Sequence, residues 1–246
     1  MIANVNELLA GPLPDVRVGI GRGSSRGCVE RSAEAFDGVR IYDDAESLVS
    51  DLMSGEIDVA VRGDLTSESM IPAVRAGMSL DRLERAVLLQ PADGRMFMLA
   101  PVGIDEGWDD AQKVDIAERA SDLARRIGMD ARIAIMSGGR DDDRGRCPEV
   151  DRTIDSSINV VDALVRDGYD AYGCQILIED AVRNAGVVMA PDGMTGNIMF
   201  RTLHFLGGAQ ALGAPVLNAP RVFVDTSRAK TDYRDSIALA KRLTEA

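Results

Sequence analysis

The chain has 246 residues, 46% of them hydrophobic and 4% aromatic, which is typical of one large or two small globular domains with an aliphatic core. Its net charge of −12 disfavours nucleic acid and anionic membrane as partners, although local arginines can still bind an anionic small molecule. Three cysteines and one histidine without metal-site spacing, no signal peptide and no bilayer-length apolar stretch predict a cytoplasmic protein without a metal.

Short apolar runs alternate with amphipathic stretches along the first part of the chain. The pattern predicts strands at Val16–Ile20, Val39–Tyr42, Ile57–Val61 and Arg95–Leu99, and helices at Cys28–Phe36, Ala45–Met53 and Glu68–Ala76. It predicts the longest helix at Asp110–Ile127, with a buried face made of Val114, Ala117, Leu123, Ala124 and Ile127.

The second part of the chain continues the same alternation. It predicts strands at Ile133–Met136, Val187–Ala190 and Arg221–Val224, and helices at Pro148–Val165, Ile176–Asn184, Thr195–Leu206 and Tyr233–Thr244. The alternation indicates an α/β fold with a mainly parallel sheet and helices on both faces. Ligands of such folds bind beyond the carboxyl ends of the strands, so the loops after strands are the places to search.

The first of these loops is rich in glycine and runs from Gly19 to Gly27, with Arg22 and Arg26 in it. Glycines allow close approach of a ligand, and a following helix offers free N–H groups to an anion. The dinucleotide pattern G-x-G-x-x-G fits poorly, but Asp43 stands where a ribose-binding acid would. A nucleotide or S-adenosylmethionine site and a purely structural turn both stay open.

Three further loops carry residues suited to an anion. Arg62 and Gly63 follow the third strand, and Thr66 can either bind a ligand or cap the next helix. A strand runs into Asp192, Gly193, Met194, Thr195, Gly196 and Asn197 at a helix start, where backbone N–H groups face outward together. Asp225–Arg228 follows a late strand and places a hydroxyl beside a guanidinium. His204 lies in an apolar stretch and is expected to be packed rather than catalytic.

In their order along the chain, these segments resemble the phosphate acetyl/butyryltransferase family. The resemblance rests on Pro191–Asn197, Gly213–Leu217 and Asp225–Arg228, together with Ser137 in its Ser-Gly-Gly turn and Cys174–Ala181. It implies two α/β domains of the isocitrate/isopropylmalate dehydrogenase-like, or phosphotransacetylase-like, fold around a cleft, and a homodimer. We expect residues 1–95 with 195–246 to form the first domain, and residues 96–194 the second.

The resemblance also implies a reaction and roles for particular residues. Members of the family move an acyl group between phosphate and coenzyme A, so coenzyme A is the cofactor to test. Ser227 and Arg228 would hold the acyl phosphate, and Asp235 would be the base. The phosphate would lie near Arg62, Gly63, Thr66, Ser137, Asp192, Thr195, Gly196 and Asn197.

The chain departs from the family at the base. Seven residues after Ser227, where the family has its Asp, stands Arg234; Asp235 is one residue further, and alignment of the last helix by Ile237 would put Ser236 there instead. These departures resemble a divergent branch, methanogenesis marker protein 4, which is described as a methyltransferase subunit X of methanogens.

Three functions therefore stay open. The first is an acyl- or phosphoryl-transfer enzyme. The second is a methyltransferase component that acts with other subunits and a corrinoid or tetrahydromethanopterin partner, since the chain has no corrinoid-binding motif of its own. The third is a non-catalytic subunit that keeps an old anion pocket.

Overall fold

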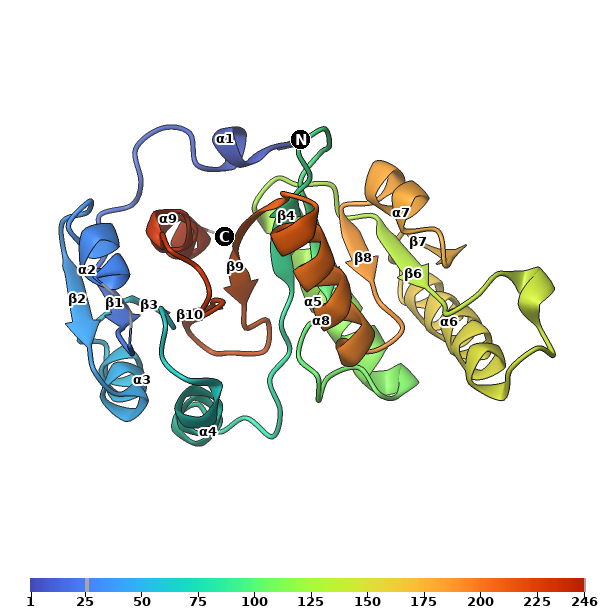
Figure 1. The fold of residues 1–246 in the computed structure, drawn as a ribbon, viewed down its shortest axis with the longest axis horizontal. Coiled ribbons are helices and arrows are strands. Elements are labelled where there is room, and N and C mark those ends of the chain that lie inside the picture. Colours follow the sequence, from blue (N-terminus) through green and yellow to red (C-terminus); the bar gives the residue numbers. More distant parts are fainter. Residues whose placement is uncertain (25–26, 246) are drawn as a thin grey trace. The chain divides into compact units, whose positions relative to one another are not determined.

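The computed structural model describes residues 1–24 and 27–245. The chain divides into two compact units (Figure 1): unit 1 contains Met1–Glu7 and Glu84–Ala211, and unit 2 contains Leu8–Leu83 and Leu212–Ala246. The limits at residues 83 and 212 differ from those placed at residues 95 and 195 from the sequence. The expected cleft between two domains stays a prediction.

Unit 2 is built on strands in the order β2-β1-β3-β10-β9. Their bounds are β1 Val18–Gly21, β2 Val39–Tyr42, β3 Val59–Val61, β9 Gln210–Pro215 and β10 Val222–Asp225. The first four strands of this order are parallel, and β9 is antiparallel to β10. Their carboxyl ends therefore meet at one edge of the sheet, which brings the loops after β1, β3 and β10 together.

Helices cover both faces of the unit 2 sheet (Figure 1): α2 and α9 lie on one face, and α3 and α4 on the other. Their bounds are α2 Cys28–Ala33, α3 Ala45–Ser54, α4 Ser67–Gly77 and α9 Arg234–Arg242. The hydrophobic core on the α3 and α4 side includes Leu48, Leu52, Met70 and Val74, which are all fully or almost fully buried. This burial of aliphatic side chains is what the low aromatic content required.

Unit 1 has strands in the order β4-β5-β8-β6-β7. Their bounds are β4 Val87–Gln90, β5 Phe97–Ala100, β6 Ile133–Met136, β7 Ala171–Gln175 and β8 Val187–Met189. All are parallel except β4, which is antiparallel to β5. The predicted mainly parallel α/β fold is confirmed, with one antiparallel strand added in each unit.

The helices of unit 1 pack on this sheet. They are α5 Asp110–Arg126, α6 Pro148–Arg166, α7 Ile178–Asn184 and α8 Gly193–Arg201, with a π-helical turn at Thr202–Leu206. A short helix, α1 Val5–Leu8, and 3-10 turns at Asp141–Asp143 and Leu243–Glu245 complete the described elements. No helix among the described residues is long and apolar enough to cross a membrane.

Helix starts follow from local chemistry. The side chains of Asp44, Thr66, Asp109 and Asp192 each accept a hydrogen bond from the backbone N–H three residues later, which satisfies a donor that the helix itself leaves free. Thr66 and Asp192 are predicted site residues, so the structure gives both of them a capping contact.

The structure corrects several sequence-based expectations. Helix α6 has 19 residues and is longer than α5, which has 17. Val114 is only partly buried, whereas Lys113 lies on the buried face of α5. The strands β4, β7 and β9 were not expected, because β7 and β9 contain glycine, alanine and glutamine rather than an apolar run and β4 has no turn residue before it.

The loops after β1 and β3 pack backbone against backbone. Gly63 has a φ of +61°, and a Cβ there would lie 1.8 Å from the carbonyl oxygen of Gly21. A Cβ at Gly21 would in turn lie 2.5 Å from the carbonyl oxygen of Arg62. Only glycine allows this approach, so the glycine-rich start of the chain serves tertiary packing.

We predict that Gly63→Ala lowers the free energy of unfolding by about 3 kcal/mol. The alanine would have to adopt a left-handed backbone conformation, and its Cβ would also clash with the Gly21 carbonyl oxygen. Gly55→Ala is the matched control: Gly55 has a φ of +84° with nothing within 4 Å, so its loss should be about 1 kcal/mol. Urea unfolding of both variants measures this. Equal losses would contradict the backbone contact.

Candidate functional site

An ion pair is buried at the carboxyl ends of β3 and β10 in unit 2. Arg62 and Asp225 are 6% and 7% exposed, and the Arg62 Nη1 donates to Asp225 Oδ1 over 2.9 Å. The same guanidinium donates to the carbonyl oxygen of Leu65 and to Ser67 Oγ, both at 2.8 Å. Arg62 thus has protein partners on all three of its nitrogens, which is a structural role; the phosphate-binding role stays a prediction.

The loop after β10 is fixed to this pair. The buried Thr226 donates its hydroxyl to the Gly63 carbonyl oxygen over 2.6 Å, and its N–H donates to the Asp225 carboxylate. Lys230 N–H then donates to the Ser227 carbonyl oxygen over 3.1 Å, which closes a turn. Ser227 Oγ accepts a hydrogen bond from Ala229 N–H, and this contact does not use the hydroxyl hydrogen of Ser227, which can be donated to another acceptor.

Arg228 stands at the tip of that turn and is exposed. It forms no ion pair with any residue that the structure describes. An exposed guanidinium beside a hydroxyl can bind a phosphate or carboxylate through two parallel hydrogen bonds. Ser227 and Arg228 lie on a loop whose base is held by these hydrogen bonds, and their ligand-binding roles stay predictions.

Lys230 is a residue of this loop that the sequence interpretation did not single out. Its ammonium donates to Ser236 Oγ over 3.0 Å and to the carbonyl oxygen of Leu212 over 3.3 Å. Burial lowers the pKa of Lys230 to about 8, against the opposing influence of Asp235 and Asp232. No sequence pattern marks this lysine, because its environment is made by β9 and α9.

The first turn of α9 carries the predicted base. Asp235 is partly buried and near enough to Lys230 to favour its charged form. Ser236, the alternative at that position, is fully buried and donates to the Leu212 carbonyl oxygen, so it has a structural role. Hydrogen bonds from Arg234 lower the pKa of Asp232 to about 2, which keeps that carboxylate charged.

The glycine-rich loop uses its polar groups internally. Arg22 pairs with Asp43 and Glu30, so the acid that could have bound a ribose is engaged by the chain itself. Gly23 N–H donates to the buried Asp64 carboxylate over 2.6 Å. Arg26 lies outside the described residues. These contacts favour the structural turn over a nucleotide site.

The predicted residues at the start of α8 belong to unit 1. Asp192 accepts from Thr195 N–H over 2.8 Å, and Asn197 Nδ2 donates to the Val102 carbonyl oxygen over 2.8 Å. Cβ atoms at Gly193 and Gly196 would lie within 2 Å of backbone oxygens of the loop after β5. Asp192, Gly193, Gly196 and Asn197 thus pack α8 onto that loop, and the Thr195 side chain stays partly exposed.

Two other predicted residues of unit 1 have protein partners. The buried Ser137 donates its hydroxyl to the Gly139 carbonyl oxygen over 2.7 Å. His204 is half-buried; its Nδ1 lies 2.7 Å from the Ala209 carbonyl oxygen, and its ring stacks on Phe200. The packed role expected for His204 agrees with these contacts.

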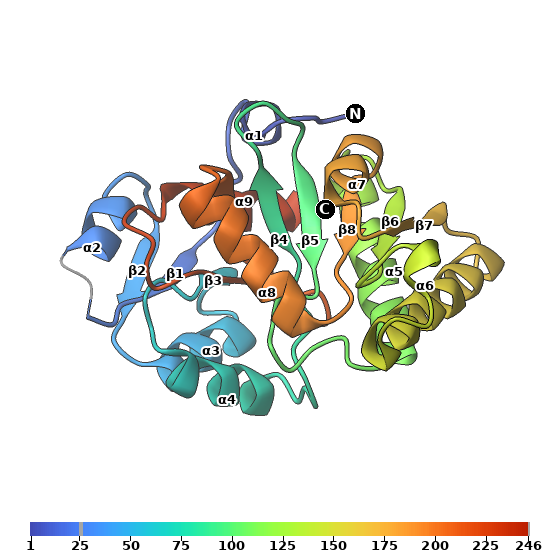
Figure 2. The ribbon, with the colours of Figure 1, turned by 45° about the vertical axis from the view of Figure 1, so that its right-hand side comes forward.

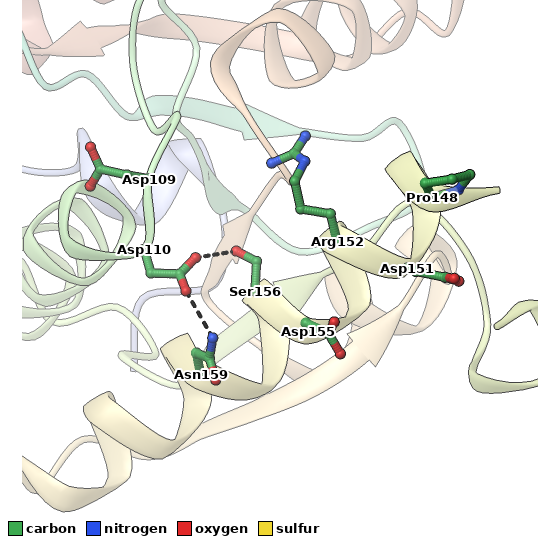
Figure 3. Close-up of a pocket in the computed structure, with 8 residues that line it drawn as sticks. All are labelled: Asp109, Asp110, Pro148, Asp151, Arg152, Asp155, Ser156 and Asn159. Atoms are coloured by element: carbon green, nitrogen blue, oxygen red, sulfur yellow. Dashed lines mark hydrogen bonds between the residues drawn. The ribbon is translucent and has the colours of Figure 1, made fainter. Parts of the chain in front are cut away.

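Unit 1 also contains an open groove that was not predicted from the sequence (Figure 3). Its volume is about 610 Å³, and it lies between the starts of α5 and α6. The residues that line it are Asp109, Asp110, Pro148, Asp151, Arg152, Asp155, Ser156 and Asn159. The four carboxylates disfavour a phosphate here.

The buried Lys113, which is 4% exposed, donates its ammonium to Ser156 Oγ of the groove over 2.6 Å. Figure 3 shows Ser156 and Asn159 directed at the Asp110 carboxylate, to which both donate. Burial lowers the pKa of Lys113. Among the described residues no cluster could hold a metal ion.

The predicted site residues thus fall into two sets. Unit 2 holds Arg62, Gly63, Thr66, Ser227, Arg228 and Asp235, and unit 1 holds Ser137, Asp192, Thr195, Gly196 and Asn197. Within unit 2, hydrogen bonds connect the loop after β3 to the two residues that precede Ser227. Thr226 donates to the Gly63 carbonyl oxygen, and Arg62 donates to the Asp225 carboxylate. That Arg62, Ser137, Thr195, Asn197, Ser227 and Arg228 line one cavity stays a prediction.

Solved structures identify the class of fold as that of the phosphotransacetylases. A branched-chain phosphotransacylase from Enterococcus faecalis superposes with a TM-score of 0.73, covering 92% of this chain and 98% of that one at 14% identity. A phosphotransacetylase from Streptococcus pyogenes superposes with a TM-score of 0.68, covering 98% of this chain and 97% of that one at 14% identity. A 4-hydroxythreonine-4-phosphate dehydrogenase from Klebsiella pneumoniae superposes with a TM-score of 0.58, covering 93% of this chain and 89% of that one at 11% identity. The fold expected from the resemblance is confirmed.

No family model matches the chain. Among curated proteins, it is 39% identical to the "Putative methyltransferase mtx subunit X" of Methanosarcina mazei over 84% of this chain and 75% of that protein. It is 38% identical to an uncharacterized methyltransferase of Methanopyrus kandleri over 87% of this chain and 85% of that protein. The chain belongs to the family of these methyltransferase mtx subunit X proteins, a divergent branch with a phosphotransacetylase-like fold.

We predict that Arg62→Leu lowers the free energy of unfolding by about 3–5 kcal/mol, because it leaves the buried Asp225 carboxylate without its opposite charge. The double variant Arg62→Leu/Asp225→Leu should recover much of this loss. Urea unfolding of the two single variants and the double variant gives the coupling energy. Unchanged stability in Arg62→Leu with lost phosphate binding would instead assign Arg62 to a ligand.

The lowered pKa of Lys230 predicts a pH dependence of stability. An unfolded lysine keeps its proton up to its ordinary pKa near 10.5, whereas the folded one releases it near 8. Between these values the unfolded state binds more protons, so the contribution of Lys230 to the free energy of unfolding rises with pH.

Unfolding of wild type and Lys230→Met, measured from pH 7 to pH 10, isolates this contribution. The difference in free energy of unfolding, wild type minus variant, should increase by roughly 2 kcal/mol over the range. Other groups titrate in both proteins and cancel in the difference. A difference that stays flat would contradict the buried position of the ammonium.

Proposed function

We propose that this chain is a transferase that binds a phosphate or acyl phosphate at the turn Ser227–Lys230 of unit 2. The observation that carries the proposal is that Arg228 is exposed and next in sequence to Ser227, on a loop held by the buried Arg62–Asp225 pair. A rigid base lowers the entropy lost when the turn binds its ligand. The phosphotransacetylase-like fold supports this class of ligand.

In an acyl transfer, the thiolate of coenzyme A would attack the acyl carbonyl carbon and the bond from that carbon to the phosphate oxygen would break. Arg228 would neutralise the departing phosphate, and Ser227 would donate its hydroxyl to it. Asp235, in the first turn of α9, would accept the thiol proton. Lys230 would add positive charge near that carboxylate. The phosphate-binding roles of Gly63 and Thr66, which also lie in unit 2, are part of the same proposal, and those expected for residues of unit 1 stay predictions.

The second candidate is a component of a methyltransferase. Relatives that are 38–39% identical carry methyltransferase names in methanogens, and one name includes the word subunit. Under this proposal the chain would act with other methyltransferase subunits, and any corrinoid or tetrahydromethanopterin group would belong to them. The anion site would then bind a phosphate-bearing ligand without acyl transfer.

Titration calorimetry with phosphate, sulfate and coenzyme A tests the anion site. We predict that Arg228→Ala weakens phosphate binding about 10- to 100-fold, roughly the value of one charge-assisted hydrogen bond. Arg75→Ala is the matched control, since Arg75 is also exposed in unit 2 but lies on α4. Equal binding by wild type and Arg228→Ala would contradict the proposed site.

Exchange between acetyl phosphate and coenzyme A separates the two candidates. Exchange that Asp235→Asn abolishes, with phosphate binding retained, would support acyl transfer. Phosphate binding that depends on Arg228, without any exchange in the pure protein, would favour the methyltransferase component.

A further inference from the structure

Lys230 is one of three lysines in the chain and differs from the other two in its exposure. Lys113 and Lys241 are buried, at 4% and 6% exposed, whereas Lys230 is partly exposed. Its N–H closes the turn that begins at Ser227 by donating to the carbonyl oxygen of that residue. The first and last Cα atoms of such a turn are less than about 7 Å apart, so the two side chains start close together.

The Lys230 side chain is held beside the strand end from which this turn leaves. Asp225, the last residue of β10, pairs with Ala214 of the antiparallel β9, so Leu212 lies two residues beyond that pair, on the side to which the chain runs after β10. The ammonium donates to the Leu212 carbonyl oxygen over 3.3 Å and to Ser236 Oγ over 3.0 Å. Figures 1 and 2 show α3 and α4 together on one side of β1 and β3, and α9, which carries Ser236, covers the opposite face.

An amine in these surroundings is a better nucleophile than an ordinary lysine. Desolvation lowers the pKa of Lys230 to about 8, although Asp235 and Asp232 oppose this shift. About a tenth of the side chains are therefore neutral at pH 7, against fewer than about one in a thousand for a lysine with a pKa near 10.5. The neutral form is the one with a lone pair for attack on a carbonyl carbon.

We propose that Lys230 accepts the acyl group of an acyl phosphate bound at the turn Ser227–Lys230, which makes it a site of self-acylation. This inference rests on the anion site of the proposed function. The neutral Lys230 nitrogen would attack the acyl carbonyl carbon, and the bond from that carbon to the phosphate oxygen would break. The oxygen would keep the bonding electron pair, and the departing phosphate would take the proton that the nitrogen loses. The products are an amide on Lys230 and inorganic phosphate, so no further reactant is needed.

The turn would hold both reactants. One bridging oxygen separates the phosphorus of an acyl phosphate from its acyl carbon, so a phosphate bound by Ser227 and Arg228 would bring that carbon to the turn that also carries the amine. Two reactants held together react much faster than the same groups in dilute solution. An acylated Lys230 would carry no positive charge, so the modification would weaken further anion binding at this turn.

Incubation of the full chain with acetyl phosphate, followed by mass spectrometry of its peptides, tests the inference. Lys230 should be acetylated at least about 10-fold faster than the exposed lysine introduced on α4 by Arg75→Lys, the matched control for an ordinary amine. With acetyl phosphate below saturation, Arg228→Ala should slow the acetylation of Lys230 about 10- to 100-fold, as it weakens phosphate binding. Added inorganic phosphate should also slow it by competition, and Lys230→Arg should remove this label.

Acetic anhydride, an uncharged acetyl donor, separates the reactivity of the amine from the anion site. With this donor, Lys230 should be acetylated at the same rate in wild type and in Arg228→Ala. Phosphate binding that depends on Arg228, without faster acetylation of Lys230 than of the control lysine, would overturn the acyl acceptor and leave the anion site standing. Acetylation by acetyl phosphate that neither Arg228→Ala nor inorganic phosphate slows would overturn both, and so would the absence of both phosphate binding and acetylation.

Discussion

A buried ion pair between Arg62 and Asp225 joins two neighbouring parallel strands of unit 2 whose residues are 163 positions apart in the chain. Each charge would be costly to bury alone, and the pair is tolerated because the guanidinium also bonds Leu65 and Ser67. It fixes the last residue of β10, and with it the direction of Thr226 and the following turn. The candidate anion site therefore depends on an interaction within the protein.

In both units, glycines let one segment of backbone approach another closely. In unit 2 the contact joins the loops after β1 and β3, and in unit 1 it joins the start of α8 to the loop after β5. Polar residues beside these glycines, among them Asp64, Asp192 and Asn197, then bond to the neighbouring loop or helix. Much of what resembles a ligand-binding motif is thus accounted for by packing, and a motif alone does not establish a function.

The acidic character of the chain is unevenly distributed. Two amines, the buried Lys113 and the partly exposed Lys230, are bonded to serine hydroxyls and have lowered pKa values because desolvation disfavours their charged forms. Carboxylates line the groove between α5 and α6, and none lies in residues 193–224. Anion binding is therefore expected where a local arginine such as Arg228 faces solvent, and not in that groove.

The sequence by itself determined the alternation of strands and helices, the parallel sheet and the family resemblance, because these depend on local periodicity and on short ordered motifs. It could not find β9, the burial of Lys113 or the environment of Lys230, and it could not tell that Arg62 bonds to Asp225. These were decided by the tertiary structure, since burial and pairing depend on residues that are distant in the chain and meet only when the sheet has formed.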